Sequence, residues 1–104
     1  MASGTIPRPD EKLLVKEYTE DNVSVSATQT YSVSFGDKSV SGYNMIGIVG
    51  VAIGSATNGG TNAHRCAIKH YYVESGANVY VGVINNASSA AKVKVTVYVL
   101  YQPK

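Results

Sequence analysis

The residues best suited to chemistry lie close together in the sequence, at His64, Cys66 and His70. They take alternate positions in the run HRCAIKHYYV, which predicts a strand over residues 64–73 that carries all three on one face. A strand rises about 3.3 Å per residue, so the two imidazoles lie roughly 20 Å apart and cannot bind one zinc ion within a single chain. His64 and Cys66 supply two ligands, and the pattern offers no third. We therefore expect no metal and no cofactor, and we interpret Cys66 as a small buried residue.

Catalysis is equally short of suitable residues. A nucleophile pair of Cys66 and His64 would join i and i+2 neighbours on one strand, which are seldom placed for in-line proton transfer. Glycoside hydrolysis needs two carboxylates that converge on a cleft, yet five of the seven acidic residues fall within the first 21 positions. The glycine-containing fragments match no phosphate-binding fingerprint. The sequence therefore predicts a protein that is not an enzyme.

Composition excludes several further classes of protein. The chain of 104 residues has nine basic and seven acidic residues, and the basic residues form no stripe dense enough to predict nucleic-acid binding. No apolar run approaches the roughly 20 residues of a membrane span, and the N-terminus lacks the basic-then-apolar order of a signal peptide. We expect no nucleic-acid partner, no membrane insertion and folding in a reducing compartment.

The chain is short enough for one domain. Residues 1–10 contain Pro7 and Pro9 and are interpreted as an extended lead-in, and residues 11–104 as a single β domain. Residues 11–20 fit either a strand or a helix that Asp10 would cap, and we favour the strand because apolar residues alternate there.

Period-two alternation defines the other elements. Lys92–Tyr101 places its odd-numbered valines on one face, which we expect to be buried. Alternation from Val23 to Phe35 is too long for one strand and is divided near residue 28. Residues 43–54 are apolar at nearly every position, which predicts a central strand covered on both faces or bulged where the phase flips. The expected strands are residues 12–18, 22–26, 30–35, 43–53, 64–73, 78–84 and 92–101, which together indicate a β-sandwich or barrel.

Candidate binding residues come from a polar loop and from the tyrosines. Residues 55–63 form the longest polar loop, and its Asn58 and Asn62 offer amides. The adjacent Tyr71 and Tyr72 must point to opposite faces of their strand, so one of them is a candidate for exposure. We predict that these four residues contribute to a site for a sugar or a peptide.

Two segments resemble a known family. Gly42-Tyr43 leads into Ile46-Gly47-Ile48-Val49, and Asn85 precedes Ser88-Ser89-Ala90-Ala91 and then Val99-Leu100-Tyr101. Over roughly residues 12–102 the chain resembles the small C-terminal head domains of phage tail fibres and related phage structural proteins of Gram-positive bacteria and their prophages. The resemblance implies a jelly-roll-like β-sandwich, usually trimeric and displayed on a virion. Together with the alternation pattern, it leads us to expect an all-β, antiparallel fold of seven to eight strands.

The function expected from this resemblance is structural and adhesive. It implies a tail-fibre or head-fibre tip, made in the bacterial cytoplasm without a signal peptide, which forms a homotrimer and engages a bacterial surface glycan or another virion protein. Two alternatives stay open. A monomeric carbohydrate-binding module and a capsid decoration protein would have the same fold.

Overall fold

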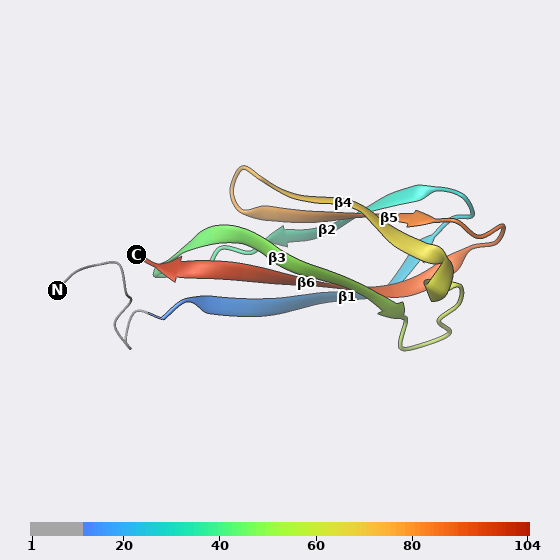
Figure 1. The fold of residues 1–104 in the computed structure, drawn as a ribbon, viewed down its shortest axis with the longest axis horizontal. Helices are drawn as coiled ribbons and strands as arrows, with labels where there is room; N and C mark the ends of the chain where they lie inside the picture. Colours follow the sequence, from blue (N-terminus) through green and yellow to red (C-terminus); the bar gives the residue numbers. More distant parts are fainter. Residues whose placement is uncertain (1–11) are drawn as a thin grey trace.

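A computed structural model describes residues 12–104, and over this range the protein is an antiparallel β-sandwich (Figure 1). Its six strands form two three-stranded sheets, which we call sheet A and sheet B. Sheet A has the order β1-β6-β3, and sheet B has the order β2-β5-β4. The strands are β1 (Leu14–Val25), β2 (Thr30–Asp37), β3 (Tyr43–Ser55), β4 (Cys66–Glu74), β5 (Asn78–Asn85) and β6 (Ala91–Pro103).

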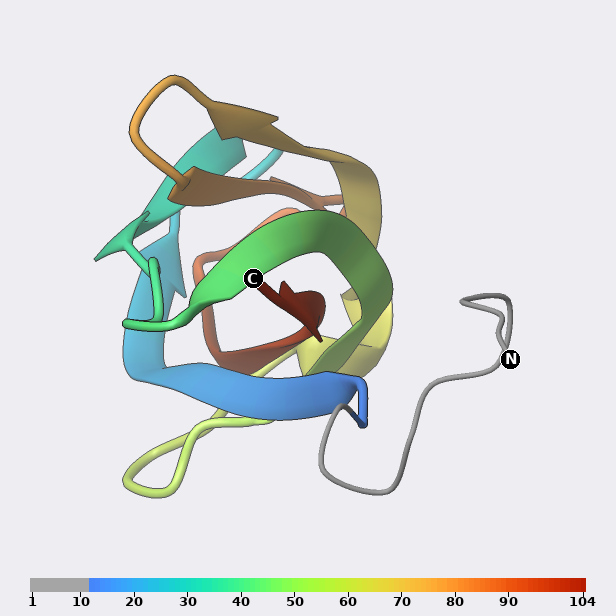
Figure 2. The same ribbon diagram turned by 90° about the vertical axis from the view of Figure 1, so that its left-hand side faces the viewer.

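The first four strands alternate between the two sheets, and β6 returns to sheet A between β1 and β3. This interleaving is jelly-roll-like, so the predicted all-β antiparallel sandwich is confirmed, with six strands in place of seven to eight. The edges of β1 and β2 lie along one flank of the sandwich, and those of β3 and β4 lie along the opposite flank (Figure 2). The predicted lead-in of residues 1–10 lies outside the described residues.

The core lies between the two central strands, β6 and β5. Every second residue from Val93 to Tyr101 is fully buried, as are Val79, Val81 and Val83 on β5. A central strand is flanked on both sides, so its inner side chains lose all contact with water, and each buried valine contributes about 1.5–3 kcal/mol. The predicted burial of the odd-numbered valines of the last strand is confirmed.

Strand β1 is longer than the sequence predicted. The interruption between the predicted strands 12–18 and 22–26 is a β-bulge, in which Asp21 and Asn22 together oppose Lys94 of β6. Asn22 has φ 55°, a left-handed conformation that asparagine tolerates better than most residues. The bulge absorbs the turn-forming residues without ending the strand, and this is why two predicted strands are one.

Strand β3 is an edge strand, so the predicted central position of residues 43–53 is wrong. Its bulges, between Met45 and Gly47 and between Ile48 and Gly50, are those expected where the apolar phase flips. The two bulges turn Ile46 and Val49 away from sheet B and leave them 51% and 56% exposed. The second apolar phase of this strand therefore faces solvent.

Strand β4 begins later than predicted, at Cys66, because Ala63–Arg65 form the short 3-10 helix η2. A bulge between Ile68 and His70 then changes the phase of the strand. Cys66 is partly buried against the core, whereas His70 lies opposite Gly82 on the outer face. The prediction that His64, Cys66 and His70 share one strand face is wrong, since a turn and a bulge separate them.

A buried asparagine closes one end of the sandwich. Asn85, at the end of β5, is completely buried. Its Nδ2 donates to the carbonyl oxygens of Val25 at 3.1 Å and Ser89 at 3.0 Å, and its Oδ1 accepts from the N–H of Ala87 at 2.9 Å. The side chain thereby ties sheet B to the end of β1 and to the loop before β6, with its hydrogen-bonding groups satisfied.

A buried tyrosine closes the other end. The hydroxyl of Tyr101, on β6, donates to the carbonyl oxygen of Lys38, so the hydroxyl of Tyr18 must donate to Tyr101 across 2.7 Å. Burial raises the pKa of Tyr101 far above its usual value, with a further contribution from its hydrogen bond to Tyr18. The Tyr101 hydroxyl therefore stays protonated, and its hydrogen bond to Lys38 links sheet A to the connection between β2 and β3.

Candidate functional site

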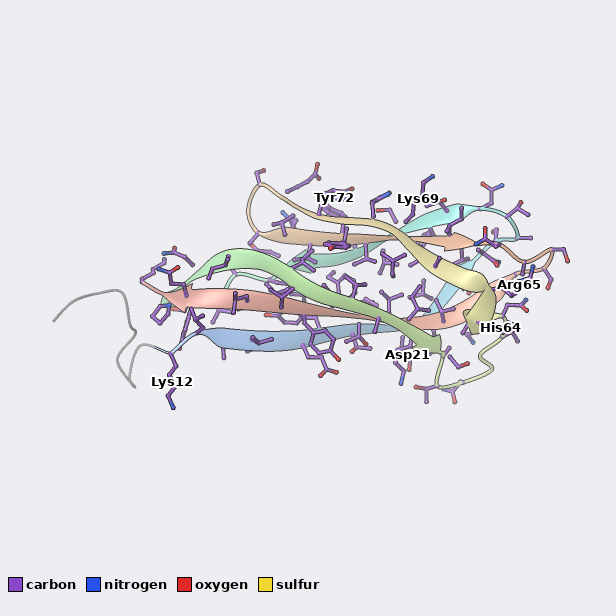
Figure 3. All side chains as sticks on the ribbon, viewed as in Figure 1. Lys12, Asp21, His64, Arg65, Lys69 and Tyr72 are labelled. Atoms are coloured by element: carbon purple, nitrogen blue, oxygen red, sulfur yellow. The ribbon has the colours of Figure 1, made fainter. Side chains whose placement is uncertain are left out.

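The four residues predicted to form a binding site are not brought together. Asn58 and Asn62 lie in the loop before η2, close to the residue where β4 begins, Cys66. Tyr72 lies six residues further along β4 (Figure 3). Six strand residues span about 20 Å. The side chain of Asn62 also has a structural role, because its Nδ2 donates to Ser89 Oγ and to the carbonyl oxygen of Ala90, both at 3.0 Å.

The two adjacent tyrosines point to opposite sides of sheet B, as predicted. Tyr72 lies opposite Tyr80 on the outer face, the side away from sheet A. Tyr71 lies opposite the buried Val81 and follows the inner phase, yet it is 53% exposed at the β4 edge of the sandwich. Of the predicted residues, Tyr72 alone belongs to the aromatic cluster on the outer face.

We call the rings of His70, Tyr72 and Tyr80 the aromatic strip. The rings of Tyr72 and Tyr80 stack across the two strands with centroids 5.1 Å apart and an interplanar angle of 20°. The centroid of His70 is 5.6 Å from that of Tyr72, with an angle of 36°. The two tyrosine rings are therefore stacked and the His70 ring is tilted against Tyr72, and the three rings adjoin on the outer face of sheet B.

Strand β2 and a glycine complete the surroundings of the aromatic strip. A Cβ atom at Gly82 would lie only 2.6–3.0 Å from three atoms of the His70 ring, so the ring rests directly on this glycine. On the far side of β5, Ser32 is paired with Gly82 and Ser34 with Tyr80, and both serines are exposed. The outer face of sheet B thus combines aromatic rings with hydroxyl groups.

The outer face of sheet A has a different composition. Val15 lies opposite Leu100 on β6, and Ile46 and Val49 emerge from β3 on the other side of that strand. Val15, Ile46 and Val49 are each more than half exposed, and Tyr98 is next to them on β6. We call these five side chains the apolar face. Exposed apolar side chains grouped on one face, here bordered by the exposed Glu17 opposite Tyr98, are typical of a protein–protein interface.

The candidate residues for catalysis or metal binding, His64, Cys66 and His70, do not form a catalytic or metal-binding cluster. Burial raises the pKa of the Cys66 thiol, so the reactive thiolate is disfavoured. His64 is exposed in η2, at the opposite end of β4 from the aromatic strip. Within residues 12–104, no group of three or more histidine, cysteine, aspartate or glutamate side chains is placed to hold a metal ion. No helix in the described part of the chain is long and apolar enough to cross a membrane.

Comparison with known proteins yields no relative. No protein-family model, curated protein or solved structure matches this chain.

Alternation along a single strand does not predict the aromatic strip, because its three rings come from two paired strands. The turn at Glu74–Asn78, with Gly76 at φ 80°, is a hairpin turn that pairs residue 72 with residue 80 and residue 70 with residue 82. Applying hairpin pairing to the sequence would have brought Tyr72 and Tyr80 together on one face. Hairpin pairing alone does not predict the bulge before His70, which brings its ring to the same face as Tyr72.

Proposed function

We propose that this domain is a non-catalytic structural and adhesion domain of a virion, a tail-fibre or head-fibre tip. In this proposal the apolar face packs against other copies to form a homotrimer. The aromatic strip stays outside and engages a component of the bacterial surface. The observation that carries the proposal is the contrast between the two outer faces, one apolar and the other aromatic and hydroxyl-bearing.

Self-association is supported by the number of apolar side chains that a single chain leaves in water. The apolar face has three side chains more than half exposed on two edge strands, with Leu100 and Tyr98 between them. Packing these side chains against another copy would remove them from water, at about 25 cal/mol per Å² of apolar surface. A trimer would also multiply a weak contact with the host by avidity.

Adhesion to a glycan is supported by the chemistry of sheet B. Sugars present apolar C–H faces and many hydroxyls, which suit aromatic rings and neighbouring serine hydroxyls. Ser32 and Ser34 lie in the same cross-strand rows as the ring of His70 and the rings of the tyrosine pair. A bacterial surface glycan is therefore the class of partner that we propose for this face.

The experiment is a pull-down on whole host bacteria and, in parallel, on purified capsids. The Tyr72→Ala variant should lose at least tenfold in binding to bacteria, because it removes the middle ring of the strip. Tyr71→Ala is the matched control, since Tyr71 is adjacent and similarly exposed but points to the other side. Equal binding by both variants, or retention on capsids alone, would overturn the adhesion proposal.

The second candidate is a monomeric carbohydrate-binding module, which the aromatic strip favours without any need for the apolar face. Light scattering distinguishes the two functions. A strict monomer at high micromolar concentration that still binds sugars through Tyr72 would favour the module. A trimer that binds capsids and not cells would instead indicate a decoration protein.

A further inference from the structure

A groove runs along the flank where the edge of β1 faces the edge of β2, the flank visible end-on in Figure 2. It has a volume of about 430 Å³, which falls within the range of small-molecule sites. Its lining comes from both sheets and consists of Glu20, Asp21, Asn22, Val23 and Ser24 of β1 and Tyr31, Ser32, Val33 and Ser34 of β2.

The groove lies where two strand positions that face the other sheet carry exposed side chains in place of buried apolar ones. Glu20 lies opposite the buried Val95, and Tyr31 lies opposite the buried Val83, so both belong to the inner phase of their sheets. Both are nevertheless exposed. A carboxylate is costly to bury without a partner, so Glu20 keeps the two sheets from closing along this flank.

The bulge in β1 fixes the Asp21 carboxylate against the loop that follows β3, beside Lys94 of the outer face. Oδ1 of Asp21 accepts hydrogen bonds from the N–H of Asn22 at 2.7 Å and from the N–H of Thr57 at 3.0 Å. Hydrogen bonding from Thr57 lowers the pKa of Asp21, with a smaller contribution from the charge of Lys94, so the group is ionised at neutral pH. The loop that carries Asn58 thus anchors one wall of the groove. Bulges recur next to functional sites because they redirect side chains in this way.

The lining selects for a hydroxyl-rich ligand. The Glu20 carboxylate accepts hydrogen bonds from hydroxyl groups, Ser32 and Ser34 at the rim both donate and accept, and Asn22 adds an amide. The half-exposed ring of Tyr31 offers a surface for the C–H face of a sugar. None of the lining residues is cationic, so the site disfavours phosphate and carboxylate ligands.

We propose that this groove binds a neutral saccharide, with hydroxyls on Glu20 and a sugar ring against Tyr31. Ser32 and Ser34 border both the groove and the face that carries the aromatic strip, so one glycan chain can cross β2 and occupy both. The inference rests on the proposed adhesion function for the source of its ligand. It adds a second contact and a preference for uncharged sugars.

The test is an NMR titration of the whole chain with glucose, galactose and N-acetylglucosamine and their disaccharides, with glucuronic acid as the anionic comparator. We expect amide shifts at Asn22, Ser24 and Ser32 with a neutral sugar, and none with glucuronic acid. Glu20→Ala and Tyr31→Ala should each weaken that binding at least tenfold. Lys16→Ala is the matched control, because Lys16 is another exposed inward-phase residue of β1 that lies outside the groove.

The outcomes separate this inference from the proposed function. No shift with any neutral sugar, or tighter binding of glucuronic acid, overturns the groove site. If whole bacteria are still bound by Glu20→Ala and Tyr31→Ala but not by Tyr72→Ala, the groove proposal fails and the adhesion function stands. If the groove binds neutral sugars while no variant or parent binds bacteria, the adhesion function fails and the groove site stands.

Discussion

The two outer faces of the sandwich rest on similar sheets but have opposite characters. Each sheet has a central strand whose inner valines are fully buried and two edge strands that flank it. On sheet B the outer positions carry aromatic rings and serines. On sheet A they carry valine, isoleucine and leucine at one end and threonine and lysine at the other.

The difference arises from how each edge strand pairs with its central strand, because the pairing decides which side chains face outward. On sheet B a short hairpin joins β4 to β5, so neighbours in the sequence become cross-strand partners and Tyr72 meets Tyr80. On sheet A the bulges of β3 turn a continuous apolar run so that both of its phases are used, one inward and one outward. Local pairing thus produces the aromatic strip, and phase shifts produce an apolar surface that lacks a partner in the single chain.

The largest expected effect comes from removing the support that both faces share. Val97 is fully buried on β6, so Val97→Asp places an unpaired carboxylate among apolar side chains and should destabilise the fold by several kcal/mol. Lys94→Ala, on the outer face of the same strand, should stay within about half a kcal/mol of the parent. Chemical denaturation measures both. A stable Val97→Asp protein together with an unfolded Lys94→Ala protein would reverse the assignment of the two faces of β6.

An intermediate effect is expected on assembly, with little change in stability. Val49→Glu places a charge on the apolar face, and light scattering should then report a monomer of 11.0 kDa in place of the homotrimer proposed for the parent. Because Val49 is 56% exposed, the free energy of unfolding of the monomer should change by less than about 0.5 kcal/mol.

The control for assembly is Ala52→Glu, which puts the same charge on the same strand at an exposed position opposite Thr96. This variant lies at the polar end of the outer face and should remain a trimer. Loss of assembly in both variants, or in neither, would remove the apolar face as the interface.

The most local effect is expected from substituting one glycine on each outer face. At Gly82 an added Cβ would meet the His70 ring at 2.6 Å, whereas at Gly50 it would meet Tyr98 Cδ1 at 3.3 Å. Gly82→Ala should therefore displace the exposed His70 ring at a cost within about 1 kcal/mol, because alanine recovers part of it through better strand propensity. Gly50→Ala should be close to neutral. If the NMR resonances of the His70 ring are unchanged in Gly82→Ala, the ring does not lie against residue 82 as described.

The sequence by itself determined the elements with a regular pattern. Alternation predicted the all-β class, the strand character of residues 14–20 and the faces of β6, because the period of two is a local property of the backbone. It also predicted that Tyr71 and Tyr72 point to opposite sides, and that the apolar run of β3 is bulged where its phase flips.

Only the tertiary structure decided which faces are covered. The order β1-β6-β3 made residues 43–55 an edge strand, although their composition is that of a central one. A bulge kept β1 continuous, and another, in β4, moved His70 to the outer face. The place of His70 in the aromatic strip depends on a shift of one residue, and the groove beside Glu20 depends on strands that meet only in the folded chain. Because one extra residue reverses the side on which every later side chain lies, no local pattern could have located them.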